Sequence, residues 1–263
     1  MFKWGPGLCL ALMGMALTGG VQAAAEPFVI ELRFINDGLS DAQKKLVQQG
    51  VERVAKLFKS GLPAVTVDIP AGSCDPSYPA LKGKLDKYVL FIETKVTANT
   101  YGLGGPCDLR DGSYLPIYGG ISLNPEMLTN DVDMLYTTIH EVLHALGAGS
   151  LWKTPNRISL SGQQDTRNLS EKVDGKWVYI APKALAEYKA MGGKDDTIPL
   201  DPDQGHWLGE VFCTEIVSGG PEAGVPNPIS RLTLASLEDL GYSVDYTAAD
   251  DYTLPDQGCT HTH

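Results

Sequence analysis

The segment His140-Glu141-Val142-Leu143-His144 constrains this chain more than any other part of its sequence. It lies in a run from Asp131 to Gly147 whose apolar residues recur at helical spacing: Leu135, Ile139, Val142, Leu143 and Leu146. On a helix, the two histidines project from one face, one turn apart. Two neutral imidazoles so placed can bind one Zn²⁺, and Glu141 can reach a water on that ion. The sequence therefore predicts a helix that carries a metal site and a general base.

The start of the chain has the pattern of a secretory signal peptide. Lys3 supplies a positive charge, Leu8 to Thr18 is an apolar run too short to span a bilayer, and small residues follow from Val21 to Ala25. We expect residues 1–25 to be removed and the mature protein to be secreted or periplasmic, without a stable membrane anchor. An uncleaved membrane anchor is the alternative. No later stretch is long and apolar enough to be a transmembrane helix.

The remaining residues, 26–263, have a length that suits one domain, or two lobes around one cleft. We expect a single catalytic domain with an N-terminal lobe of residues 26–149 and a C-terminal lobe of residues 150–263. The hydrophobic fraction of 43% is ordinary for a globular protein. The net charge of −11, without a basic cluster, argues against nucleic acid or an anionic membrane surface as a partner.

Four cysteines follow the predicted cleavage site: Cys74, Cys107, Cys213 and Cys259. An even number of cysteines after a signal peptide predicts two disulfides. Of the three possible pairings we favour Cys74–Cys107 and Cys213–Cys259, which place one bridge in each half. A zinc site made by these cysteines is disfavoured because no C-x-x-C pair is present.

The order of predicted elements is that of an α+β fold. Predicted strands cover Phe28–Ile35, Ala64–Ile69, Tyr88–Val96, Ile117–Leu123 and Trp177–Ala181. Predicted helices run from the capping box at Ser40 to about Lys59, and over 131–147, Pro182–Met191 and Ser230–Leu240. Pro70–Lys84 and Asn99–Tyr114 are predicted to be loops. Few periodic runs follow Gly147, so the second half is predicted to be rich in loops.

A catalytic Zn²⁺ usually takes three protein ligands, so a third ligand is required. Gly147 extends the motif to H-E-x-x-H-x-x-G, in which the glycine lets the chain leave the helix sharply. The usual short continuation places the third histidine where this chain has Ser150. Outside the extreme C-terminal tail the only other histidine is His206. The alternative third ligand is a carboxylate, Glu171 or Glu187.

The chain resembles the leishmanolysin-like metzincin proteases in a series of motifs: 140–147, Leu151-Trp152, His206-Trp207, 215–219, 227–233 and 239–242. In that family a long insertion separates the glycine from the third histidine. The resemblance therefore implies that His140, His144 and His206 hold one catalytic Zn²⁺, with Glu141 as the general base. It also implies an N-terminal lobe with a twisted mixed sheet and two helices, including the active-site helix, and a loop-rich C-terminal lobe with one further helix.

The chain departs from this family at Val217, where the family has a methionine in the tight turn beneath the zinc. Valine can pack there but lacks the flexible thioether. Glu210 and Glu215 follow His206 and could orient a metal-binding side chain by accepting a hydrogen bond from it.

The resemblance implies a secreted zinc metalloendopeptidase that hydrolyses peptide bonds in proteins or peptides. The alternative is a weakly active or inactive zinc-stabilised extracellular binding or adhesion protein on the same fold. Val217 favours this alternative. Glu141 opposes it, because a purely structural zinc site does not require a general base.

Overall fold

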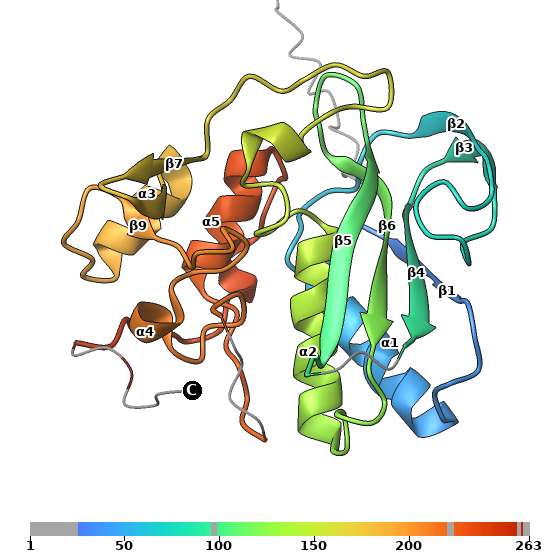
Figure 1. The fold of residues 1–263 in the computed structure, drawn as a ribbon, viewed down its shortest axis with the longest axis horizontal. Helices are drawn as coiled ribbons and strands as arrows, with labels where there is room; N and C mark the ends of the chain where they lie inside the picture. The colour runs from blue at the N-terminus through green and yellow to red at the C-terminus, as the bar shows by residue number, and fades with distance from the viewer. Residues whose placement is uncertain (1–25, 96–98, 220–223, 257–258, 260–263) are drawn as a thin grey trace, which may run out of the picture.

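The computed structural model describes residues 26–95, 99–219, 224–256 and 259, so the predicted signal peptide, residues 1–25, lies outside the described residues. Figure 1 shows a mixed sheet with two helices in the N-terminal half and a loop-rich C-terminal half beside them. The α+β class predicted from the sequence is confirmed. The predicted single catalytic domain, with its lobe boundary near residue 150, stays a prediction.

The N-terminal half is built on a four-stranded sheet with the strand order β1-β4-β6-β5. Its strands are β1 (Ile30–Phe34), β4 (Tyr88–Thr94), β5 (Gly102–Leu109) and β6 (Pro116–Leu123). Strands β1, β4 and β6 run parallel, and β5 pairs antiparallel to β6 at one edge. The mixed sheet that the resemblance implies is therefore present.

Two helices, α1 (Asp41–Ala55) and α2 (Asp131–Ala145), pack against one face of this sheet (Figure 1). Helix α1 begins at the predicted capping box of Ser40. Helix α2 begins after Asn130, whose side chain accepts a backbone N–H of the first turn. Successive side chains of a strand point to opposite faces, and those facing the helices are buried, as at Leu90 and Ile92 of β4.

The opposite face of the sheet is covered by a hairpin of β2 (Val65–Ile69) and β3 (Leu81–Leu85). The prediction that 70–84 is entirely loop is wrong, since β3 begins inside it. The three central residues of β3, 82–84, are exposed, and Gly83 has a φ of 95°. An exposed Lys-Gly-Lys sequence gives no apolar pattern that would predict a strand. The strand is recognised only from its pairing with β2 in the structure.

The prediction that 99–114 is loop is also wrong, because this segment contains all of β5. Its sequence is rich in glycine, which has a low intrinsic preference for strands. The glycines are needed because the strand passes very close to α2. A Cβ atom at Gly104 would lie 2.3 Å from the backbone oxygen of Glu141. Close packing in the folded state, absent from any local pattern, therefore decides the structure of β5.

The single further helix that the resemblance implies for the C-terminal half is wrong. The described residues of this half form three α-helices: α3 (Pro182–Ala190), α4 (Gly209–Phe212) and α5 (Arg231–Leu240). The residue pattern predicts α3 and α5, whereas α4 is too short to show a period. A small sheet contains β7 (Ser170–Val173), β8 (Lys176–Tyr179) and β9 (Ile198–Pro199).

Both favoured disulfides, Cys74–Cys107 and Cys213–Cys259, are present. The first joins the loop between β2 and β3 to the edge strand β5. The second joins the end of α4 to the C-terminal segment. Among the described residues, no helix has the length and apolar character needed to cross a membrane.

Candidate metal site

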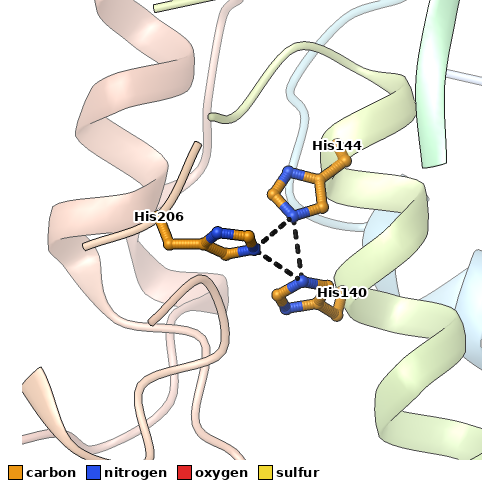
Figure 2. Close-up of side chains that lie close together, drawn as sticks. All are labelled: His140, His144 and His206. Carbon is orange, nitrogen blue, oxygen red and sulfur yellow. Dashed lines mark hydrogen bonds between the residues drawn. The ribbon is translucent and has the colours of Figure 1, made fainter. Parts of the chain in front are cut away.

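Helix α2 presents His140 and His144 toward the C-terminal half of the chain (Figure 2). The helix ends at Ala145, Leu146 is its C-cap, and Gly147 follows with a φ of 109°, in the region that favours glycine. A Cβ atom there would also approach Leu151 to 2.8 Å. The sharp exit predicted at Gly147 is therefore observed.

His206 approaches from a loop that follows β9, and its Nε2 atom meets those of the two helix histidines (Figure 2). The Nε2 atoms of His140 and His144 are 2.9 Å apart. The Nε2 atom of His206 is 3.1 Å from that of His144 and 3.3 Å from that of His140. The structure thus brings the three predicted ligands together, although His206 is 62 residues from His144.

The outer nitrogens of the two helix histidines are bound by backbone carbonyls. Nδ1 of His140 donates to the oxygen of Ile216 at 2.5 Å, and Nδ1 of His144 donates to that of Ala148 at 2.7 Å. A carbonyl oxygen only accepts, so the hydrogen of each neutral imidazole lies on Nδ1. Each Nε2 atom therefore carries a lone pair directed at the other histidines.

His206 has the same tautomer because of a carboxylate. Its Nδ1 donates to Oδ2 of Asp203 at 2.6 Å, and this hydrogen bond is the main cause that lowers the pKa of Asp203 to about 2. With a hydrogen on each Nδ1, the three Nε2 atoms face one another and present their lone pairs when the rings are neutral. Tetrahedral ligands about 2.0 Å from a zinc ion are about 3.3 Å from one another, close to the observed spacing. The residues fit a metal ion that prefers nitrogen ligands.

Burial prepares the two helix histidines for this role. It lowers the pKa of His140 well below its usual value, and the neighbouring imidazoles of His144 and His206 add to the effect. Burial likewise lowers the pKa of His144 to about 4. Both imidazoles are therefore neutral near pH 7, which is the form that binds a metal.

Glu141 lies directly after His140 and is only 5% exposed. Its side chain packs against β5, where a Cβ atom at Gly102 would lie 2.8 Å from Glu141 Cγ and 2.9 Å from Oε1. Burial raises the pKa of Glu141 to about 8. A cation held by the imidazoles would oppose this rise, because a nearby positive charge favours the carboxylate.

The turn that contains Val217 lies against the site, since its residue Ile216 accepts the hydrogen bond from His140. Val217 is fully buried. Its N–H donates to Glu215 Oε2 at 2.7 Å, and its carbonyl oxygen accepts the N–H of Trp207 at 3.1 Å. The turn is therefore joined both to the helix that carries His140 and to the residue that follows His206.

Glu215 is a fully buried carboxylate that holds this turn to the start of α5. Besides Val217, it accepts the N–H of Ser230 at 3.2 Å, the hydroxyl of Ser230 at 2.6 Å and the hydroxyl of Thr233 at 2.6 Å. Burial raises the pKa of Glu215, and these hydrogen bonds oppose the rise. The hydroxyl oxygen of Thr233 in turn accepts a hydrogen bond from the indole N–H of Trp207 at 3.0 Å.

Asp203 is not among the carboxylates that the sequence predicts to orient a ligand. Those are Glu210 and Glu215, but Glu210 is exposed and Glu215 binds the turn rather than an imidazole. The signal available in the sequence was an acidic residue in a turn-rich segment three positions before His206. Neither of the alternative third ligands belongs to the histidine cluster found among the described residues. Glu171 is exposed, and Glu187 pairs with Arg231.

Comparison with known proteins adds a family-level similarity. No family model matches the chain. The chain is 27% identical over 164 residues to the human ciliated left-right organizer metallopeptidase, covering 55% of this chain and 21% of the relative. It is 29% identical over 150 residues to the mouse protein of the same name, covering 51% and 21%. The match thus spans about a fifth of each relative. These names support a metalloprotease at the level of the family and do not favour the inactive alternative.

Proposed function

We propose that this chain, whose resemblance to leishmanolysin-like metalloproteases the human and mouse relatives support, is a secreted zinc metalloendopeptidase. The observation that carries the proposal is the convergence of the Nε2 atoms of three histidines beside the buried carboxylate of Glu141. Two disulfides agree with an oxidising compartment outside the cytoplasm.

His140, His144 and His206 would hold the ion. Three neutral imidazoles leave the fourth tetrahedral position open, which is the usual arrangement of a catalytic zinc site. When bound, Zn²⁺ would supply an acidified water and polarise the carbonyl of the peptide bond. The hydrogen bonds on the Nδ1 atoms keep the three rings in the orientation that binding requires.

Glu141 is the proposed general base. Its carboxylate would take a proton from the attacking water and pass it to the nitrogen of the departing amine, so that the peptide bond breaks without forming a free amide anion. Its position next to His140 and its burial against Gly102 restrict where the carboxylate can lie. A poorly hydrated carboxylate is also a stronger base than one in water.

Strand β5 is the proposed guide for the substrate. It is the edge of the sheet, and within the described chain its residues 102–106 pair with β6 alone. Unpaired backbone groups on such an edge can pair with an extended peptide. Because Gly102 and Gly104 contact Glu141, a peptide along this edge would lie beside the general base.

The first test is to measure zinc content and casein hydrolysis of the purified chain, with His206→Ala beside it. We expect about one zinc ion per chain and metal-dependent hydrolysis for the wild type. Loss of a ligand should weaken zinc binding by more than the roughly 10–100-fold typical of an outer hydrogen-bonding partner, and hydrolysis should fall with it. Zinc binding without hydrolysis of any peptide would contradict the proposed activity, and unchanged zinc in His206→Ala would exclude His206 as a ligand.

Gly102→Ala should lower activity without removing the metal. The added methyl would meet Glu141 Cγ at 2.8 Å, so the carboxylate must move. A displacement of about 1 Å can cost about 100-fold in rate, and kcat for a peptide substrate is the quantity to measure. Gly105→Ala is the matched control for kcat, because nothing of the protein lies within 4 Å of a Cβ atom there, so the methyl can change how a peptide lies along β5, and hence KM, without moving Glu141. Equal activity in the two variants would show that β5 does not fix the base.

A further inference from the structure

The loop that carries His206 is organised by the side chain of Asp203. Oδ1 of Asp203 accepts the N–H of Gly205 at 2.7 Å, while Oδ2 accepts Nδ1–H of His206 at 2.6 Å. The backbone closes the same loop, since the N–H of Asp201 donates to the oxygen of His206 at 3.0 Å. One carboxylate thus joins the loop backbone to the imidazole.

His206 differs from the two helix histidines in how its ring is held. His140 and His144 are buried on a helix and donate to backbone carbonyls. The side chain of His206 is 24% exposed and stands on a loop, so packing restricts its rotation less. Of the three imidazoles, only that of His206 has a charged hydrogen-bond partner among the described residues.

We propose that Asp203 is a positioning residue that sets the metal affinity of the site by holding Nε2 of His206 toward His140 and His144. This inference rests on the proposed function, since it concerns the same metal site. A carboxylate hydrogen-bonded to a ligating imidazole fixes the tautomer and makes the ring a stronger ligand. Its negative charge also offsets part of the charge of a bound cation, which three neutral imidazoles cannot do.

The test uses the full chain with Asp203→Asn, which removes the charge, and Asp203→Ala, which also removes the contact. Zinc affinity is measured by competition with a chelator of known affinity. We expect about 10–100-fold weaker binding in Asp203→Asn and at least as large a loss in Asp203→Ala. The control is Asp75→Asn, because Asp75 likewise accepts two hydrogen bonds within a turn, from the N–H and the hydroxyl of Ser77, but none from an imidazole. The control should bind zinc within about threefold of the wild type.

Two further readouts separate positioning from a loss of fold. The zinc-free variants should still unfold in one cooperative thermal transition, which shows that they are folded. The imidazole nitrogen resonances of zinc-free protein should show His206 protonated on Nδ1 in the wild type and as a mixture of tautomers in Asp203→Ala. Wild-type zinc affinity in both Asp203 variants would overturn the positioning role while leaving the proposed function intact. Absence of zinc binding by the wild type would instead overturn the proposed function.

Discussion

Glu141→Gln is expected to remove nearly all peptide-bond hydrolysis while zinc binding stays close to the wild-type level. Glutamine has the shape of glutamate but cannot accept the proton of the attacking water. General-base catalysis typically contributes about 10²–10⁴-fold, so a loss in kcat/KM of that size is expected. The zinc content should not change, because the three imidazoles and their Nδ1 partners are untouched.

The same variant should also be at least as stable as the wild type. Glu141 is buried, and its raised pKa shows that burial opposes its charge. A neutral side chain of equal size avoids that cost. Glu210→Gln provides the control, because it changes the same kind of residue at an exposed position near His206. Wild-type turnover in Glu141→Gln would exclude Glu141 as the base, and loss of zinc would show that it helps to hold the ion.

Glu215→Ala is expected to have the largest effect on stability. The carboxylate accepts four hydrogen bonds, and its removal would leave buried donors of Val217, Ser230 and Thr233 without their partner. Each unsatisfied buried group costs about 1–3 kcal/mol, although some would find water in the space left. We expect a loss of about 3–5 kcal/mol, among the largest that single substitutions produce. For a chain of this size that lowers the melting temperature by roughly 6–20 °C.

Thermal unfolding should be followed with a chelator present, so that loss of bound metal does not contribute to the change. Glu187→Ala is the comparison, because it removes the partner of Arg231 in a half-exposed ion pair. Exposed pairs contribute about 1 kcal/mol or less, so this variant should unfold near the wild-type temperature. Similar melting temperatures for the two variants would show that the buried network around Glu215 adds little.

The sequence predicted the site well where chemistry and local geometry coincide. The spacing of His140 and His144 predicts one face of α2, and both lie on it. The scarcity of histidine and the family resemblance predict His206 as the third ligand, and its Nε2 atom lies within 3.3 Å of both others. The capping box at Ser40 also appears as predicted, because a cap is formed by neighbours in the sequence.

What the sequence could not predict depends on contacts between distant segments. Strand β5 is formed because Gly102 and Gly104 fit against Glu141, a contact that no local propensity describes. Nothing in the sequence distinguishes Asp203 from the other acidic residues around it, since only the folded loop brings its carboxylate to His206. The hydrogen bond from His140 to the carbonyl of Ile216 could not be predicted either, because every residue has a backbone acceptor and no sequence pattern marks this one.

The distance along the chain between the second and third histidines bears on when the site can form. His206 is made 62 residues after His144, which takes about 3–12 s at common rates of synthesis. During that interval α2 can present two imidazoles and Glu141 but lacks the loop that completes the metal site. If the proposed function holds, a growing chain cannot yet cut proteins, and hydrolytic activity begins only after the C-terminal half has docked. Late docking of the C-terminal half would then protect the proteins of the producing cell from cleavage during synthesis of the enzyme.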